Sequence, residues 1–479
     1  MKKQSRFFSA LALSLCLFVL CFSQASAAPL LARQDKPGKN AAALQRVLND
    51  LAGQRTEVIN IQRELVARPA IGPEAGGEGE EAKAAWIMTL LKDRGITHVE
   101  RVDSVDRTVS LDPDAKTRNV RPNIIVRYPG AAGLEKGRTL WIICHMHVAA
   151  PGPLELWEGS PWTLRVRGDV LHGRGVMDNY QSITAALLLF ESLAKNQSVP
   201  PMNLGLVLHS QNSGFRYLLE NKPELFRADD LFLVPDYGSP QGTTFGVAEK
   251  GLLWLKITIA GKPAHAAAGS ADSSALVAGS RFIAALSNLD TVFSAHNALF
   301  TTPVSTFVPT KAFTNADGIN AVAAEYTLYL DSRFVPPYTP GEVEQSIRGL
   351  AESLTKGTGT AFSMERLLAY PALPPTSEQS PVALALGRAV RAQLGGELKT
   401  EGISTTTAAS FVRAKGLPVV VWAKMDPANR QSPNEHALIG DHLDEARVFA
   451  RMLFDEEAAK AAPVASPTTP KAANGAETP

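Results

Sequence analysis

The stretches LWIICHMHVAAPG (residues 140–152) and LHGRGVMDNYQS (residues 171–182) place two histidines and an aspartate at the ends of apolar runs. The apolar run before His145 is typical of a strand that is buried on both faces. In an extended chain, His145 and His147 point to one side and Met146 points away. This pattern indicates the start of a divalent metal site, and a pair of hydrogen-bonded histidines at a strand end is the alternative.

The second stretch adds a carboxylate. Gly173, Arg174 and Gly175 predict a tight turn, and Asp178 follows just before the apolar helix expected at residues 181–195. Asp178 therefore lies near a helix start. A helix N-cap, worth about 1 kcal/mol, is the alternative role for this side chain.

With the tryptophan stretch WEGSPW (residues 157–162), the order strand, His, tryptophan loop, GRG turn and Asp resembles a zinc-dependent family. That family contains aminoacylase, acetylornithine deacetylase, succinyl-diaminopimelate desuccinylase and glutamate carboxypeptidase. The resemblance covers about residues 40–457 and implies an α/β fold, with a mostly parallel sheet covered by helices on both faces, as in zinc exopeptidases. Further matching segments are residues 64–95, 123–130, 249–269, 320–337 and 431–441.

The resemblance also implies a division into domains. Residues 28–248 and 366–457 would form the catalytic-type α/β domain, where alternating apolar strands and helices support a parallel sheet. Residues 249–365 would form an inserted α+β lid or dimerisation domain. Residues 458–479 are low in complexity and rich in Ala, Pro and Thr, so we expect a disordered tail.

Members of the family hold two zinc ions bridged by an aspartate. Carried onto this sequence, the first metal position is complete, with His145, Asp178 as the bridge, and Asp236 in LFLVPDYGSP. Three protein ligands are the usual arrangement of a catalytic zinc ion. The resemblance therefore implies one zinc ion at these three residues.

The second metal position is incomplete. The family has a Glu-Glu pair here, and the first glutamate is the general base. In this chain the matching residues 209–220 read HSQNSGFRYLLE. Gln211 and Asn212, which are neutral amides, stand in place of the two glutamates. Gln431 replaces a family histidine ligand, and His147 replaces the family aspartate that orients the neighbouring histidine. We expect at most one tightly held ion, and loss of a general base lowers a rate by about 100- to 10,000-fold.

Three histidines are candidates to replace the missing base. His147 follows His145, His209 ends the strand expected at residues 202–209, and His436 follows the aligned Glu435. An unperturbed imidazole pKa of about 6.5 suits proton transfer near neutral pH. A hydrogen-bonded rim histidine is the alternative for each, and His147 as a fourth ligand would make the site structural.

The resemblance also implies residues that contact substrate. His265 in GKPAHAAAG matches a family histidine that reaches the active site of the partner subunit in a homodimer and binds the oxyanion. Asn320 and Arg333 match positions on the carbonyl and carboxylate side of the substrate, and an arginine suits carboxylate recognition. The alternatives are a strand-end turn for Asn320 and a surface ion pair with Asp331 for Arg333.

Residues 1–27 carry two lysines and an arginine, then an apolar run, and end in Ala-Ser-Ala before Ala28. This pattern predicts a cleaved secretory signal, with an uncleaved anchor as the alternative. The mature protein would be periplasmic or secreted. Of the three cysteines, Cys16 and Cys21 leave with the signal, and Cys144 alone cannot form an internal disulfide.

Composition excludes other classes of function. The chain has 48 basic and 47 acidic residues and a net charge of +1, without long runs of one sign. Neither nucleic-acid binding nor membrane binding after signal cleavage is therefore expected. The sequence contains no phosphate loop, dinucleotide turn or serine nucleophile elbow.

Two hypotheses follow. The first is an exported metal-dependent hydrolase of peptide or N-acyl amino-acid bonds, using one ion and a relocated base. The second is a catalytically inactive relative that keeps the fold as a periplasmic binding or scaffold protein. The retained ligands favour the first hypothesis, and the lost base favours the second.

Overall fold

We describe the protein from a computed structural model, which places residues 39–105, 120–269 and 271–462. The predicted signal segment at residues 1–27 and residues 463–479 of the predicted tail lie outside this described part. Residues 458–460 of that tail belong to a short helix, α12 (Glu456–Lys460). Within the described residues, no helix combines the length and apolarity needed to cross a bilayer.

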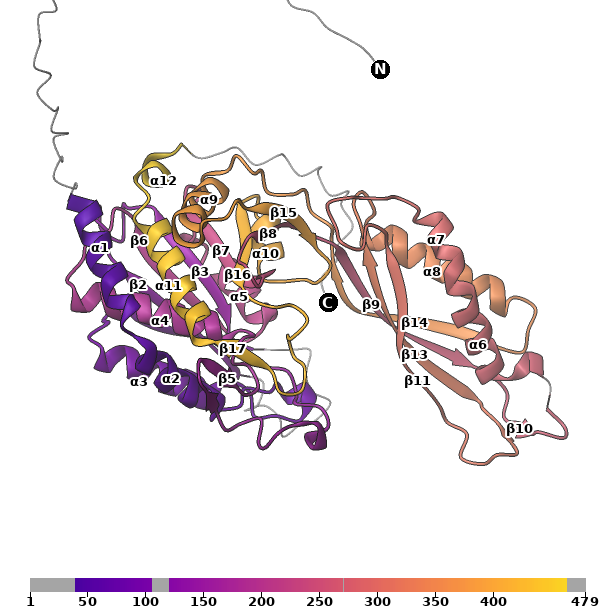
Figure 1. The fold of residues 1–479 in the computed structure, drawn as a ribbon. Coiled ribbons are helices and arrows are strands. Elements are labelled where there is room, and N and C mark those ends of the chain that lie inside the picture. Colours follow the sequence, from indigo (N-terminus) through magenta and orange to yellow (C-terminus); the bar gives the residue numbers. More distant parts are fainter. Residues whose placement is uncertain (1–38, 106–119, 270, 463–479) are drawn as a thin grey trace, which may run out of the picture. The chain divides into compact units, whose positions relative to one another are not determined.

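A large mixed sheet forms the centre of the first domain (Figure 1). Its strand order is β1-β2-β6-β3-β7-β16-β8-β15. The strands are β1 (Val99–Val105), β2 (Val120–Tyr128), β3 (Thr139–His145), β6 (Asn203–His209), β7 (Leu231–Ser239), β8 (Thr244–Glu249), β15 (Lys399–Ile403) and β16 (Val419–Lys424).

The centre of this sheet is parallel. Strands β6, β3, β7 and β16 run parallel to one another, and β8 runs parallel to β15. The pairs β1–β2, β2–β6 and β16–β8 are antiparallel. His145 and His209 are register partners at the carboxyl ends of β3 and β6. Ligands of parallel sheets bind beyond the carboxyl ends of the strands, so this edge is where a site is expected.

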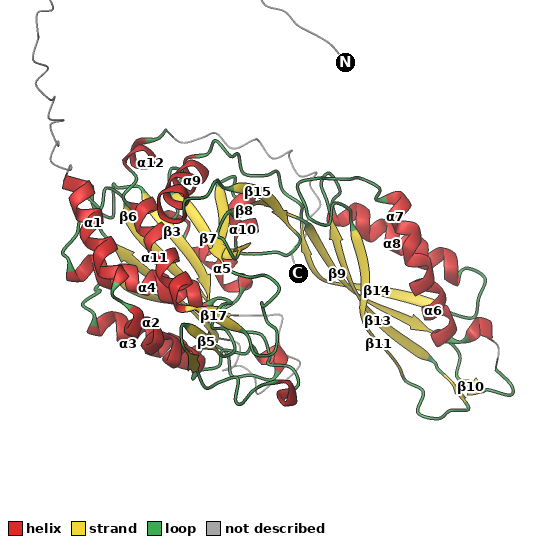
Figure 2. Ribbon diagram, viewed as in Figure 1, coloured by secondary structure: helices red, strands yellow, loops and turns green. Residues whose placement is uncertain are grey.

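Helices cover both faces of the large sheet (Figure 2). Leu140 and Ile142 of β3 pack on one face against α1, α2, α3, α4, α9 and α11, and Trp141 and Ile143 pack on the other against α5 and α10. This alternation confirms the predicted α/β fold. The helices are α1 (Lys39–Ala52), α2 (Arg55–Val66), α3 (Glu81–Asp93), α4 (Tyr180–Lys195), α5 (Asn212–Asn221), α9 (Pro381–Leu394), α10 (Ala409–Ala414) and α11 (Ile439–Leu453).

Helix α4 shows why the sequence folds this way beside the candidate site. Its apolar residues recur on every side, and nearly the whole helix is buried between the sheet and α11. The helix therefore fixes the position of the chain that precedes it, including Asp178.

The inserted domain is a four-stranded antiparallel sheet in the order β11-β13-β9-β14. Helices α6 and α8 pack on one of its faces, and Thr339 begins α8 with a capping box that includes Glu342. Strand β14 runs past the predicted domain boundary at residue 365. The elements are β9 (Gly251–Ala260), β11 (Thr306–Thr314), β13 (Glu325–Phe334), β14 (Ala361–Tyr370), α6 (Ala275–Ala285), α7 (Leu289–Val292) and α8 (Pro340–Thr355).

Two small sheets hold loops that carry predicted site residues. Strands β4 (Arg165–Arg167), β5 (Val170–His172) and β17 (His436–Leu438) form one sheet in the large domain. Strands β10 (Ala264–His265) and β12 (Ala321–Val322) pair in the inserted domain.

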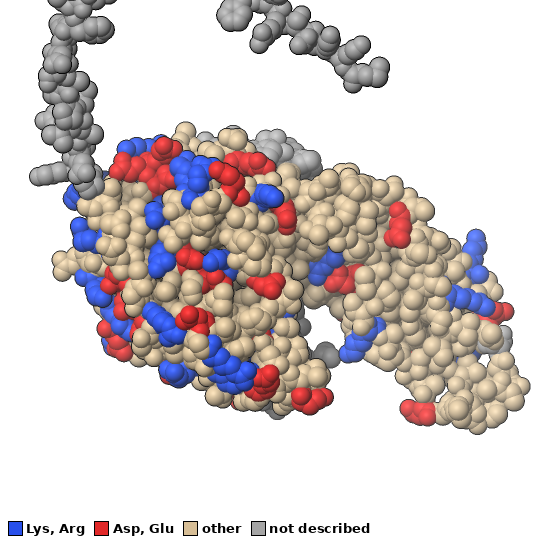
Figure 3. Space-filling view, viewed as in Figure 1, with Lys and Arg blue, Asp and Glu red and all other residues tan. Residues whose placement is uncertain are grey.

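Charged side chains of both signs are interspersed on the face drawn in Figure 3, without an extended patch of one sign. This distribution agrees with the near-neutral net charge of the chain. An extended basic surface, which nucleic-acid binding requires, is therefore not seen on this face.

Candidate metal centre

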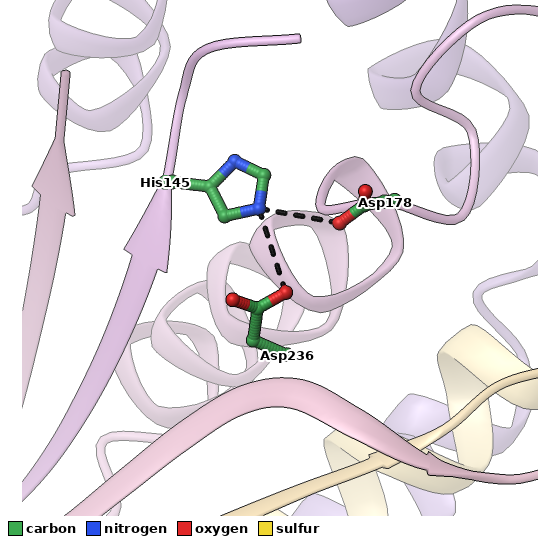
Figure 4. Close-up of side chains that lie close together, drawn as sticks. All are labelled: His145, Asp178 and Asp236. Atoms are coloured by element: carbon green, nitrogen blue, oxygen red, sulfur yellow. Dashed lines mark hydrogen bonds and ion pairs between the residues drawn. The ribbon is translucent and has the colours of Figure 1, made fainter. Parts of the chain in front are cut away.

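Three of the predicted ligands converge at the carboxyl edge of the large sheet (Figure 4). His145 ends β3, Asp236 lies near the end of β7, and Asp178 lies just before α4. One potential ligand atom from each lies within 4.8 Å of the others, and all three side chains are buried. The parallel pairing of β3 and β7 brings the first two together, and the buried α4 positions the third.

His145 is oriented by a backbone carbonyl. Its Nδ1 donates to the carbonyl oxygen of His147 at 3.0 Å, so Nε2 is the nitrogen that faces the carboxylates. Nε2 lies 3.2 Å from Asp178 Oδ1 and 3.7 Å from Asp236 Oδ1. Burial alone would lower the pKa of His145, but the two carboxylates outweigh it and raise the pKa to about 10. In the family, an aspartate at the position of His147 orients the metal-binding histidine. In this chain the backbone carbonyl of His147 orients His145 instead.

Asp178 is not an N-cap. Asn179 precedes the first turn of α4, and its side chain makes no capping bond. The Asp178 carboxylate instead faces His145 with Oδ1 and accepts hydrogen bonds with Oδ2 from Arg430 and Gln431, at 2.8 and 2.9 Å. Burial would raise the pKa of Asp178, but the charges of Arg430 and His145 hold it well below its usual value. The carboxylate is therefore ionised and contacts groups on both sides.

Arg430 joins the two carboxylates, although no sequence motif predicts this role. Its NH2 group lies 2.6 Å from Asp236 Oδ1, and its NH1 donates to the Asp236 carbonyl oxygen at 3.2 Å. Burial would lower the pKa of Arg430, but Asp236 and Asp178 raise it above its ordinary value. The only sequence signal was its position beside Gln431.

Glu435 is a second residue whose role the sequence did not reveal. Its Oε1 accepts from the backbone N–H groups of Met177 and Asp178, at 3.2 and 3.1 Å. Its Oε2 lies 2.9 Å from Arg174 NH1, and the Arg174 guanidinium lies 5.0 Å from the ring centroid of Trp157. Burial raises the pKa of Glu435. This contact set explains why the GRG turn and the tryptophan loop accompany Asp178 in the sequence.

Two further histidines flank His145. The His147 ring lies 4.3 Å from it and the His209 ring 6.3 Å, between centroids. His147 Nδ1 donates to the Ser210 carbonyl oxygen and His209 Nδ1 to that of Gln211, each at 2.9 Å. Burial lowers the pKa of His147 well below its usual value and that of His209 to about 3, so both rings are neutral with Nε2 as the basic nitrogen.

His436 takes a different place. It is exposed on β17 and pairs with His172 of β5, with their ring centroids 5.6 Å apart. Within the described part of the chain it shows no contact with His145, Asp178 or Asp236. It is therefore the weakest of the three candidate bases.

The segment expected to replace the family Glu-Glu pair supplies no carboxylate. Ser210 directly follows β6, and its backbone N–H donates to Asn123 Oδ1 at 3.1 Å. Gln211 precedes α5, which begins at Asn212. Because α5 begins this close to the strand end, no acidic side chain stands between His209 and the helix.

The predicted substrate residues lie in the inserted domain. His265 and Asn320 are exposed, and the side-chain amide of Asn320 lies 3.2 Å from His265 Nε2. Arg333 is held by Asp331 through two hydrogen bonds, of 2.8 Å from Nε and 3.0 Å from NH2. The structure thus brings His265 and Asn320 together and shows the ion pair that was the alternative for Arg333.

The residues present fit one divalent ion. Zinc is commonly bound by imidazole nitrogen and carboxylate oxygen, and His145, Asp178 and Asp236 offer these atoms in one buried cluster. Among the described residues, the opposite side of the Asp178 carboxylate faces the N–H donors of Arg430 and Gln431, which do not bind a cation. The arrangement is suited to one ion with three protein ligands.

Comparisons with known proteins identify sequence relatives of this chain. The profile of peptidase family M20/M25/M40 matches residues 141–455. An uncharacterized metallohydrolase of Methanococcus maripaludis is 29% identical over 417 residues, covering 83% of this chain and 98% of the relative. Succinyl-diaminopimelate desuccinylase 1 of Alteromonas mediterranea is 25% identical over 323 residues, covering 65% and 80%.

Solved structures share the fold. The dipeptidase Dug1p of Saccharomyces cerevisiae superposes with a TM-score of 0.70 at 13% identity, covering 87% of this chain and 98% of that chain. Human carnosine dipeptidase 1 superposes with a TM-score of 0.67 at 14% identity, covering 87% and 100%. At these identities the likeness establishes the fold alone.

Proposed function

The chain belongs to peptidase family M20/M25/M40, which confirms the predicted resemblance to zinc metallopeptidases and deacylases, and from this premise we propose its specific activity. We propose an exported hydrolase of peptide or N-acyl amino-acid amide bonds that uses one metal ion. The observation that carries the proposal is the convergence of His145, Asp178 and Asp236 at the carboxyl edge of the large sheet.

Each residue of this cluster has a defined task in the proposed reaction. His145 Nε2, Asp178 Oδ1 and an Asp236 carboxylate oxygen would hold the ion. A divalent ion held there would polarise the scissile carbonyl as a Lewis acid and activate water. Glu435 positions Asp178 by accepting the N–H groups of its turn.

His147 is our candidate for the general base. Its Nδ1–H is fixed on the Ser210 carbonyl, so Nε2 is the nitrogen that can accept a proton. Burial lowers the pKa of the ring, so Nε2 is a weaker base than an ordinary imidazole. His147 is half-buried and can meet solvent, whereas His209 is 1% exposed. We therefore assign proton transfer to His147 and a packing role to His209.

The substrate class is proposed from the relatives. One relative bears the name of a desuccinylase, and two structural neighbours are described as dipeptidases, so amide bonds next to a free amino-acid carboxylate are the first candidates. His265, acting from the inserted domain of a partner subunit in a homodimer, would donate a hydrogen bond to the developing oxyanion.

A second candidate function is a non-catalytic binding or scaffold protein of the periplasm. Two observations favour it. Residues 210–212 hold no carboxylate that could serve as the family base. In addition, Arg430 already neutralises part of the charge of Asp178 and Asp236.

Metal content and hydrolysis measured together separate the two candidates. The mature protein, residues 28–479, would be assayed for metal by elemental mass spectrometry and for activity on dipeptides and N-acyl amino acids, including N-succinyl ones. Asp178→Ala is the test variant. Asp169→Ala is the matched control, because Asp169 is an exposed aspartate that pairs with Arg55 at the surface and lies outside the ligand cluster.

We expect about one ion per chain and hydrolysis of at least one substrate class, with both lost in Asp178→Ala and kept in Asp169→Ala. A wild-type protein that stays metal-free and inactive after Zn²⁺ reconstitution would contradict the hydrolase proposal and favour the binding protein.

A further inference from the structure

The guanidinium of Arg430 lies against the same two carboxylates that would hold the metal ion. Nε contacts Asp178 Oδ2 at 2.8 Å and NH2 contacts Asp236 Oδ1 at 2.6 Å. The Arg430 side chain is 22% exposed, while those of Asp178 and Asp236 are 1% and 9% exposed. A permanently charged group is therefore held in a mostly buried site.

The two oxygens of Asp178 divide the centre into two sides. Oδ1 faces His145 Nε2, which is the side where an ion fits. Oδ2 accepts from Arg430 Nε and from Gln431 Nε2. The Asp178 carboxylate thus presents one oxygen to the candidate metal ligand His145 and the other to a guanidinium.

The loop that carries Arg430 is tied to the turn that carries Asp178. Glu435, at the end of the loop, accepts from Asp178 N–H and pairs with Arg174. Within the loop, Asn429 bonds with the backbone of His436 and with Ser432. Gln431 takes a left-handed φ of 56°, which turns the chain directly after Arg430. The position of the guanidinium is therefore specified by the fold.

We propose that Arg430 is the second cation of this centre: its guanidinium takes the position beside Asp178 Oδ2 that a second metal ion would otherwise occupy, and its NH2 group also contacts Asp236 Oδ1, the oxygen nearest His145. The residue limits the centre to one ion, and it directs Asp178 Oδ1 toward His145. This inference rests on the metal site of the proposed function. It goes further by naming the residue that sets the number of ions and lowers their affinity through charge repulsion.

The test counts Zn²⁺ ions and measures their affinity by titration calorimetry on the mature protein. Arg430→Met keeps much of the side-chain length without the charge, and Arg430→Lys keeps the charge. Gln431→His adds an imidazole on the Oδ2 side, since Gln431 Nε2 lies 2.9 Å from Asp178 Oδ2. Arg413→Met is the matched control, because Arg413 is a buried arginine paired with Glu249 at 3.0 Å, outside the centre. Thermal melting of each metal-free variant checks that it is folded.

We expect one Zn²⁺ per chain in the wild-type protein, in Arg430→Lys and in Gln431→His alone. Arg430→Met should bind Zn²⁺ at least tenfold more tightly. The double variant Arg430→Met/Gln431→His should bind two ions. Arg413→Met should melt at a lower temperature and keep the wild-type affinity for Zn²⁺.

Two results would overturn the inference alone, while one ion still binds to the wild-type protein. The first is an unchanged or weaker affinity in a folded Arg430→Met variant, and the second is a second ion in Gln431→His with Arg430 in place. Absence of Zn²⁺ binding from all the proteins would overturn both the inference and the proposed function. Binding by Arg430→Met but not by the wild-type protein would support the role of Arg430 and contradict only the metal-dependent activity.

Discussion

The two groups of predicted site residues differ in how firmly the fold holds them. In the large domain, His145, Asp178 and Asp236 are buried and tied by hydrogen bonds from three segments of the chain. In the inserted domain, His265 and Asn320 are exposed and contact each other at 3.2 Å. The first group is therefore built before any ligand arrives, and the second is available to a substrate or a partner subunit.

This difference separates two kinds of mutational effect. Changes in the large-domain centre should alter stability and metal affinity together, because the same buried contacts serve both. Changes at the exposed residues of the inserted domain should alter hydrolysis alone.

The largest effect on folding is expected for Glu435→Ala. The substitution leaves the buried Arg174 guanidinium without its carboxylate and removes the acceptor for Asp178 N–H. We expect a loss of about 3–5 kcal/mol in the free energy of unfolding, measured by urea denaturation. Zn²⁺ affinity should fall by about 10- to 100-fold, as for other residues that orient ligands.

Glu158→Ala is the control for that variant, because Glu158 is exposed and pairs with Arg165 and Arg167 at the surface. Glu158→Ala should leave the free energy of unfolding and the Zn²⁺ affinity nearly unchanged. If both substitutions lowered the free energy of unfolding and the Zn²⁺ affinity equally, the buried contacts of Glu435 would matter no more than the surface ion pairs of Glu158.

A large effect confined to catalysis is expected for His265→Ala. If His265 binds the oxyanion, its loss should lower kcat by about 100- to 1,000-fold. Because the ring is exposed, metal content and melting temperature should stay at wild-type values. A lower melting temperature or lost metal would break the contrast between the two groups.

Glu445→Gln should remove part of the pH dependence of stability. Burial raises the pKa of Glu445 to about 7, although Ser182, Gln181 and the Lys424 N–H partly oppose this. The folded protein thus binds this proton more tightly than the unfolded chain, so the stability contribution is present at low pH and is lost as pH rises to about 7. The variant should lack this loss of stability, which is on the order of 3 kcal/mol.

Urea denaturation between pH 4.5 and pH 8 measures this difference. Glu365→Gln is a suitable control, since Glu365 is an exposed residue of the inserted domain. The prediction would be contradicted if the free energy of unfolding changed with pH in the same way for the wild-type protein and for Glu445→Gln.

The smallest effect is expected for Arg333→Ala. Its Nε and NH2 already bond with Asp331, and both side chains are partly exposed, so the pair should contribute less than about 1 kcal/mol. We expect little change in KM for substrates with a free carboxylate. A KM raised tenfold or more, with Asp331→Ala unaffected, would restore carboxylate recognition as the role of Arg333.

The site residues that could be predicted from the sequence are those that lie at the ends of apolar strands. His145 and Asp236 follow apolar runs, so their place at one edge of a parallel sheet was readable from local pattern. Arg430 and Glu435 lie in a polar loop, and their contacts with Asp178 span 252 and 257 positions. No local sequence pattern encodes such contacts. The roles of Arg430 as the second cation and of Glu435 in positioning Asp178 could therefore be recognised in the three-dimensional structure but not in the sequence.

The loop after β16 that carries Arg430 and Glu435 also dictates the order in which the centre can assemble during synthesis. His145, Asp178 and Asp236 leave the ribosome first, and the inserted domain of residues 249–365 follows. The guanidinium that neutralises the carboxylates and the glutamate that holds their turn are made near the end of the chain. A chain that stops before Arg430 therefore carries the Asp178 and Asp236 carboxylates with His145 as their cationic partner but without the guanidinium, and cannot complete this part of its core.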